Sequence, residues 1–241
     1  MSNPVLNEKF SAQEQALQGE VMTVNGTIQL TALLGLIVVM SAIFVWSRFS
    51  LGYTDLGVTL MSGGAIVGFI VAMIVIFAKV KYLVPVYAAA EGCFLGGISA
   101  TLEASYPGIV SQAVAGTFAA LFSMLILYKA GMIRATEKFR SVLLISMFSI
   151  LAIYLVNFIG GFFNYSVPVV NSSSNFGILF SVVVVIVAAL NLILDFDYIE
   201  RGAENNLPKD NEWFGAFGLM ITLVWLYLEI LRLLAKLNSR D

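Results

Sequence analysis

The sequence contains no histidine, a single cysteine and few charged residues. Lys, Arg, Asp and Glu make up 12% of its 241 residues, about half of the share found in ordinary soluble domains. The absence of histidine excludes His-ligated zinc or haem and a Ser-His-Asp triad. The lone Cys93 excludes an intrachain disulfide and a cysteine-rich metal site. A formal net charge of −2 leaves no basic patch for nucleic acid, so nucleic acid is not an expected partner.

Apolar residues dominate the chain and fall into long segments. They account for 59% of the sequence, and the mean hydropathy is +0.91. Windows of about 19 apolar residues, each long enough to cross a bilayer, lie near 27–47, 57–79, 83–101, 108–128, 141–163, 176–198 and 214–236. A spanning helix satisfies its own backbone hydrogen bonds in lipid. The pattern therefore predicts an all-α membrane protein, a bundle of seven transmembrane helices within the lipid bilayer.

The rest of the chain is short and polar. Residues 1–26 form a predicted N-terminal tail, 27–236 the transmembrane domain and 237–241 a short C-terminal tail. The longest predicted connection is the charged stretch of about 15 residues after Ile199, far below the roughly 50 residues that a folded domain needs. Any chemistry must therefore reside in the helix bundle or at its two ends.

The basic residues are distributed unequally between the two sides of the membrane. The N-terminal tail and the connections on its side hold nine of them: Lys9, Lys79, Lys81, Lys129, Arg134, Lys138, Arg140, Arg201 and Lys209. The other side holds four: Arg48, Arg232, Lys236 and Arg240. Because basic residues concentrate on the cytoplasmic side, we expect the N-terminus in the cytoplasm and the C-terminus outside.

Acidic residues inside the spans are candidate sites, because each costs about 2.5–3.5 kcal/mol or more to place in a membrane. Without histidine, a reactive thiol or a phosphate-binding loop, carboxylates suit protons and hard cations. Calcium in particular takes six to eight oxygen ligands. Four acids qualify: Glu91, Asp195, Asp197 and Glu229.

Glu91 is the most central of the four. It follows Leu83 by eight residues and so lies about 12 Å into the bilayer. Gly92 and Gly96 form a face of small residues beside it, which allows another helix to approach closely. Glu91 is therefore expected to face protein or water, where it either lines an ion path or makes a structural hydrogen bond.

The two aspartates of the sixth span are predicted to point in different directions. Asp195 and Asp197 are separated by about 200° around a helix. Asn191, one turn from Asp195, would extend a polar stripe inward. Asp197 adjoins Glu200 and Arg201, and its simplest interpretation is a solvated helix end.

Glu229 in the seventh span has Arg232 three residues later, a spacing that brings two helical side chains together. The pair is either an internal ion pair or part of a cation or proton pathway with Arg232 as a tether. If Glu229 shares a desolvated site with Asp195, the two carboxyls cannot easily both ionise. They would then titrate as a coupled unit near neutral pH.

The depths of these two acids are hard to reconcile in straight helices. Asp195 is near one end of its span, whereas Glu229 lies about 24 Å beyond Trp213. Contact would require the seventh helix to enter the bilayer late, to tilt, or to break at Gly215 or Gly218.

Several stretches resemble the Bax-inhibitor family of seven-span membrane proteins, and its bacterial branch looks closest. The resemblance rests on Leu194-Asp195-Phe196-Asp197-Tyr198-Ile199 and Leu226-Tyr227-Leu228-Glu229-Ile230. Supporting stretches are Ala90-Glu91-Gly92, Gly96-Gly97-Ile98-Ser99, Asn3-Pro4-Val5-Leu6 and Met22-Thr23-Val24-Asn25-Gly26-Thr27. The resemblance covers nearly the whole chain.

The resemblance implies a bundle whose last helix is central and a pH-sensitive calcium leak through a pair of acids in spans 6 and 7. That pair falls on Asp195 and Glu229, although the family usually has aspartate where Glu229 stands. Calcium ions and protons are then the implied ligands, with no resident cofactor. The inner (plasma) membrane is the implied location.

Our leading hypothesis is a pH-regulated, calcium-permeable leak channel. One alternative is a proton-coupled cation exchanger, and another is a non-conducting regulator that binds other membrane proteins, such as a protease. An enzyme is not expected, since no nucleophile paired with a base, metal cluster or cofactor loop is visible. Asp195 and Glu229 are the predicted gate, sensor and calcium ligands, and the supporting residues are Glu91, Asp197, Asn191 and Arg232.

Overall fold

The structure is a computed structural model that describes residues 20–163, 165 and 167–239. Three features used in the sequence analysis, Lys9, Arg240 and the stretch Asn3-Pro4-Val5-Leu6, lie outside the described residues, as does most of the predicted N-terminal tail.

Seven long helices account for most of the described chain, and each coincides with one of the predicted apolar windows. They are α2 (Val24–Ser50), α3 (Thr54–Ala78), α4 (Val84–Ser105), α5 (Ile109–Lys129), α6 (Glu137–Gly161), α8 (Asn175–Glu204) and α9 (Asn211–Asn238). The short 3-10 helix η1 (Lys81–Leu83) precedes α4, and one helical turn, α7 (Pro168–Asn171), precedes α8. All seven are long and apolar enough to cross a membrane. The prediction of an all-α, seven-span membrane protein is confirmed.

Polar side chains satisfy the free backbone N–H groups at several helix starts. The hydroxyls of Thr23, Thr136 and Ser174 accept hydrogen bonds at the first turns of α2, α6 and α8. At α5 the carboxylate of Glu103, from the end of α4, accepts from the N–H groups of Gly108 and Val110 at 2.6 and 3.0 Å. Such caps define where a helix begins.

The charged stretch after Ile199 is mostly helical, so the predicted connection of about 15 residues is wrong. Helix α8 continues to Glu204 and α9 begins at Asn211, which leaves only residues 205–210 between them. Charged side chains one turn apart, such as Asp197 and Arg201, support the extension. Asn206, with φ of 52°, turns the chain after the helix ends.

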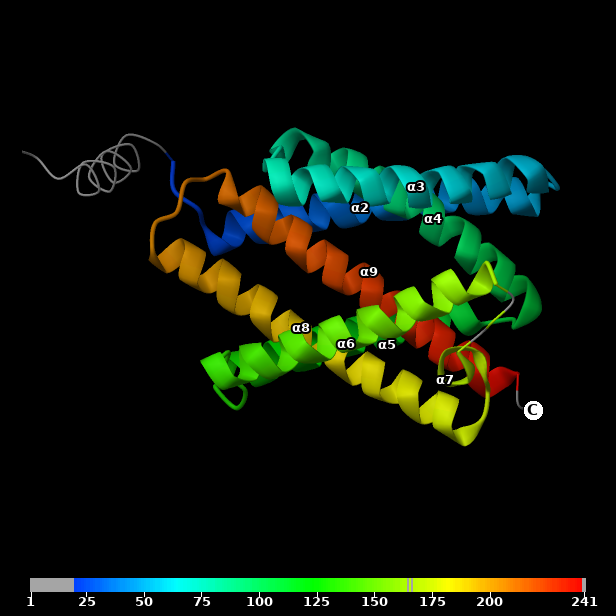
Figure 1. The fold of residues 1–241 in the computed structure, drawn as a ribbon. Helices are drawn as coiled ribbons and strands as arrows, with labels where there is room; N and C mark the ends of the chain where they lie inside the picture. Colours follow the sequence, from blue (N-terminus) through cyan, green and yellow to red (C-terminus); the bar gives the residue numbers. More distant parts are fainter. Residues whose placement is uncertain (1–19, 164, 166, 240–241) are drawn as a thin grey trace, which may run out of the picture.

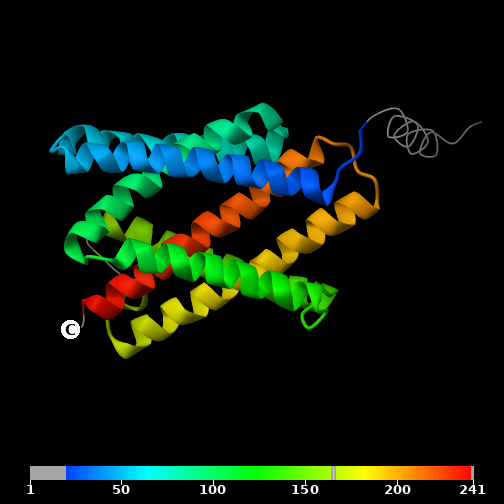
Figure 2. The same ribbon diagram turned by 180° about the vertical axis from the view of Figure 1, so that it is seen from behind.

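Helix α9 runs diagonally through the middle of the molecule (Figures 1 and 2). It lies between the group formed by α2, α3 and α4 and the group formed by α5, α6 and α8. It packs against α2, α4, α5 and α8. Of its apolar segment, 67% is buried, the largest share among the seven spans. The last helix is therefore central, as predicted.

Glycines allow α2 and α4 to approach each other closely. A Cβ atom added at Gly92 would lie 2.4 Å from the carbonyl oxygen of Val38, and one at Gly96 would lie 2.4 Å from that of Ala42. Both distances are shorter than any normal contact, so neither position can take a side chain without moving the helices apart. The predicted close approach at this face is confirmed.

We therefore predict that Gly96→Ala destabilises the protein by about 1–3 kcal/mol, the usual cost of overpacking. Gly63→Ala on α3 is the matched control, since a Cβ there meets nothing within 4 Å. Thermal unfolding of the purified proteins in detergent measures both. Equal unfolding temperatures for the two variants would contradict the close approach of α2 and α4.

Candidate functional site

Two antiparallel helices, α8 and α9, carry three of the four acids singled out above. Two contacts near opposite ends define how the helices are aligned. Lys236 of α9 donates to Ser181 Oγ of α8 at 2.8 Å. Toward the other end, Asp195 of α8 faces Gly218 and Thr222 of α9. This alignment sets the depth of every polar group between the two helices.

The carboxylate of Asp195 lies against the first half of α9. A Cβ atom added at Gly218 would be 3.5 Å from Asp195 Oδ1, and the Thr222 side chain interacts with the same carboxyl group. Its other oxygen, Oδ2, is fully buried and has no hydrogen-bond partner among the described residues. Such an atom costs free energy that a proton, a water molecule or a cation would recover.

Glu229, in contrast, is fully satisfied. Its side chain is 2% exposed. Oε1 accepts from Trp225 Nε1 at 3.2 Å, and Oε2 accepts from the Tyr154 hydroxyl of α6 at 2.9 Å. Arg232 donates to both oxygens at 2.9 and 3.0 Å and to the Tyr154 oxygen at 2.6 Å. The predicted i,i+3 ion pair is present, within a cluster that ties α9 to α6.

No hydrogen bond joins Asp195 to Glu229 in the described part of the chain. On α9, Thr222 precedes Glu229 by seven residues, so the two acids sit at levels about 10 Å apart along the helix. Leu192 of α8 and Leu226 of α9 lie at intermediate levels, and both are 0% exposed. They belong to one apolar cluster. In this conformation the two carboxyls therefore do not form a single ligand set for a cation.

Helix α9 is not broken along the stretch that carries Thr222 and Glu229. It is one continuous helix through Gly215 and Gly218. Both glycines instead allow close contacts: Gly215 with Thr27 and Ile199, and Gly218 with Asp195. Of the geometries considered from the sequence, a break at these glycines is not the one adopted.

Asn191 is buried beside this interface, with 5% of its surface exposed. Its side-chain amide donates to the carbonyl of Val187, one turn back in the same helix, at 3.0 Å. The side-chain N–H group of Asn191 is therefore used within its own helix. None of the hydrogen bonds among the described residues links Asn191 to either acid.

Asp197 is not a solvated helix end, so that interpretation is wrong. Only 6% of the residue is exposed. Its carboxylate accepts from Arg140 of α6 and, at 3.0 Å, from Arg201 one turn later in α8. It points away from Asp195, as their 200° separation predicts. The sequence pattern could not predict the contact with Arg140, because this residue is 57 positions away from Asp197.

Glu91 is half-buried in the other group of helices, between α4 and α3. A Cβ atom added at Gly68 of α3 would lie 3.1 Å from Glu91 Oε1. Gly68 thus leaves room for the carboxylate. The structure places Glu91 against protein, as expected, and no hydrogen bond among the described residues links it to Asp195 or Glu229.

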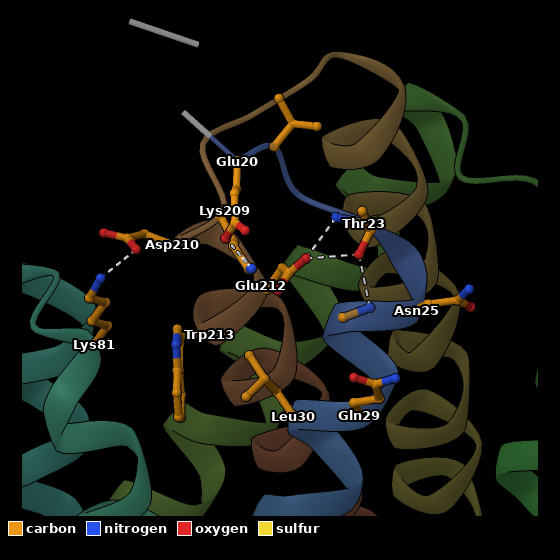
Figure 3. A pocket seen from close by; sticks show the side chains of 12 residues that line it. Glu20, Thr23, Asn25, Gln29, Leu30, Lys81, Lys209, Asp210, Glu212 and Trp213 are labelled. Atoms are coloured by element: carbon orange, nitrogen blue, oxygen red, sulfur yellow. Dashed lines mark hydrogen bonds and ion pairs between the residues drawn. The ribbon is translucent and has the colours of Figure 1, made fainter. Parts of the chain in front are cut away.

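One further acid, Glu212, lies at the start of α9 and was not singled out from the sequence (Figure 3). It is 4% exposed, and its Oε1 accepts from both the backbone N–H and the hydroxyl of Thr23 at 2.9 Å. Nearby, Lys209 pairs with Glu20, and this hydrogen bond raises the pKa of Lys209. These contacts attach the segment before α2 to the α8–α9 connection and to the first turn of α9.

Two residues that contact Glu229 were also not identified from the sequence. Tyr154 is one of many aromatic residues in the spans, and only the tertiary structure shows that it contacts Glu229. Trp225 precedes Glu229 by four residues, a spacing that would have identified it. Within the described residues no group of three or more His, Cys, Asp or Glu side chains could hold a metal ion.

The Glu229 cluster generates a prediction about stability. Arg232→Gln leaves a buried carboxylate without its counter-charge, which typically costs about 3–5 kcal/mol. The double variant Glu229→Gln, Arg232→Gln removes both charges and is expected to be more stable than Arg232→Gln alone. Chemical unfolding in detergent tests this ordering. A double variant less stable than the single one would show that charge compensation is not what Arg232 supplies.

Comparison with known proteins agrees with this architecture. No protein of curated function matches the chain. The family described as Bax inhibitor 1 like matches residues 3–239, nearly the entire chain. We therefore conclude that the chain belongs to the Bax inhibitor 1 like family.

Proposed function

We propose that the protein is a pH-sensitive, calcium-permeable leak channel of the plasma membrane, with Asp195 as the site that binds either a proton or the passing cation. The observation that carries this proposal is the buried Oδ2 of Asp195, which has no partner among the described residues. Among the described acids, those buried as whole residues, at positions 197, 212 and 229, all accept hydrogen bonds from donors of the protein.

An acid in this position favours cations and protons over other ligands. A carboxylate inside an apolar bundle is strongly destabilised unless a positive charge accompanies it. Asp195 faces Gly218, which contributes no side chain, and the Thr222 hydroxyl. Carboxylate and hydroxyl oxygens are ligands that calcium accepts, and water would complete its coordination.

The described conformation is that of a closed channel under this proposal. Leu192 and Leu226 fill the space between the levels of Asp195 and Glu229. Beyond them, Arg232 neutralises Glu229, and the Tyr154 hydroxyl joins both to α6. Opening therefore requires α8 and α9 to separate at these leucines, and the Glu229 cluster sets how readily α9 moves relative to α6.

Proton binding and cation binding compete at Asp195 because only the ionised carboxylate attracts a cation. Calcium flux is accordingly expected to rise with pH over the range in which Asp195 loses its proton. Glu229 is about two helical turns away and is held by Arg232, so it takes no part in this competition in the closed conformation. The two carboxyls could meet at one cation only after the leucines move apart.

The first prediction of this proposal concerns flux through the purified protein in liposomes. Asp195→Asn is expected to reduce calcium flux at least about tenfold, the effect of losing one strong cation interaction of about 1.4 kcal/mol, and to abolish its dependence on pH. Glu204→Gln, an exposed acid on the same helix, is the control. Wild-type flux and pH response in Asp195→Asn would contradict the proposal.

The same assay separates the channel from the other two candidate functions. A leak runs down the calcium gradient alone, whereas an exchanger would require an opposing proton gradient. A regulator of other membrane proteins would give no flux in liposomes that contain only this chain. Either of the last two results would replace the channel assignment.

The second prediction concerns the leucines. Leu192→Ala removes a fully buried side chain between the two acids and is expected to raise calcium leak at neutral pH. Leu36→Ala on α2, where the leucine is 56% exposed, is the control and should leave the leak unchanged. An equal leak in the two variants, with both folded, would show that Leu192 does not close the path.

A further inference from the structure

A second site, mostly apolar but with two arginines, lies at the ends of α6 and α8, outside the α8–α9 interface. It is a cavity of about 500 Å³. Both helices contribute to it, together with the connection that follows α8. The lining residues are Arg140, Leu144, Leu194, Tyr198, Arg201, Gly202, Asn205 and Leu207.

The cavity has an excess of positive charge. Arg140 and Arg201 both line it, while Asp197 between them supplies a single negative charge. One positive charge therefore remains uncompensated by this triad. Both arginines pair with Asp197, yet 34% of the Arg140 side chain and 53% of the Arg201 side chain stay exposed. Their exposed guanidinium donors suit an anionic oxygen ligand such as phosphate.

The remaining wall is apolar and accessible. Leu144 on α6 is 48% exposed and Tyr198 on α8 is 43% exposed. Both lie where the apolar segments of their helices give way to charged residues, the level at which lipid headgroups meet the hydrocarbon. The cavity thus places two arginines next to a surface that an acyl chain would cover.

We propose that this cavity binds an anionic phospholipid. Its phosphate would accept hydrogen bonds from Arg140 and Arg201, and its acyl chain would lie along Leu144 and Tyr198. A phosphate is the ligand that best matches the excess charge and the exposed guanidinium donors. The apolar wall at the same opening favours a lipid over a free anion, and basic pockets between transmembrane helices recognise anionic headgroups in this manner.

Lipid binding to the full-length protein in detergent tests the proposal. The probes are phosphatidylglycerol and phosphatidylcholine with identical acyl chains, and the measurement is the fraction of protein that retains each lipid in native mass spectrometry. Wild-type protein should prefer phosphatidylglycerol. Arg201→Gln should weaken that preference about fivefold, the effect of one basic residue near an anionic surface. Asp197 keeps Arg140 in this variant, so the helices stay paired.

Lys138→Gln is the matched control, because it removes one positive charge from the same end of α6 without lining the cavity. It should leave the preference for phosphatidylglycerol unchanged. If Lys138→Gln weakens binding as much as Arg201→Gln, or if the wild-type protein shows no preference, the site does not exist.

Two further measurements in the same experiment distinguish a bound lipid from a bound free anion. Leu144→Trp fills the accessible apolar wall and should reduce retention of phosphatidylglycerol, whereas inorganic phosphate at millimolar concentration should not displace the lipid. Displacement by inorganic phosphate, together with unchanged retention by Leu144→Trp, would identify a phosphate site and overturn the lipid assignment.

Discussion

Charged groups buried in an apolar bundle must be neutralised or hydrogen-bonded, and this requirement governs how the helices around α9 are arranged. Lipid supplies neither hydrogen bonds nor counter-charges, so each buried charge has to find its partner within the protein. Glu229 obtains Arg232 from its own helix and Tyr154 from α6. Glu212 obtains donors from the segment before α2. These contacts hold the central helix to both sides of the bundle.

Asp195 departs from this pattern. It faces a glycine and a threonine, and one of its oxygens is buried without a partner among the described residues. A protein could avoid the cost by placing asparagine there, or by supplying an arginine as it does for Asp197 and Glu229. The exception suits a site that must exchange its positive partner, because a permanent counter-charge would exclude a passing cation. The contrast between Asp195 and its neighbours is the structural basis of the proposed channel.

Local patterns in the sequence predicted the features that depend on helical periodicity. The seven spans follow from the length of the apolar windows. The Glu229–Arg232 pair at i,i+3, the divergence of Asp195 from Asp197 and the close approach at Gly92 and Gly96 follow from spacing along one helix. The partners that these acids find on other helices could not be predicted from such spacing. Arg140 reaches Asp197 across 57 residues and Tyr154 reaches Glu229 across 75. Spacing within one helix cannot reveal such pairs, and it cannot set the offset between two helices that keeps Asp195 and Glu229 apart.

The most direct test of the central claim is infrared difference spectroscopy of the reconstituted protein, with and without calcium, in the wild type and in Asp195→Asn. If Asp195 binds either a proton or a cation, calcium should diminish the stretching band of a protonated carboxyl in the wild type, and raising the pH should diminish the same band. Neither change should occur in Asp195→Asn. A calcium-sensitive band that persists in Asp195→Asn would contradict the account, because another acid would then be the site.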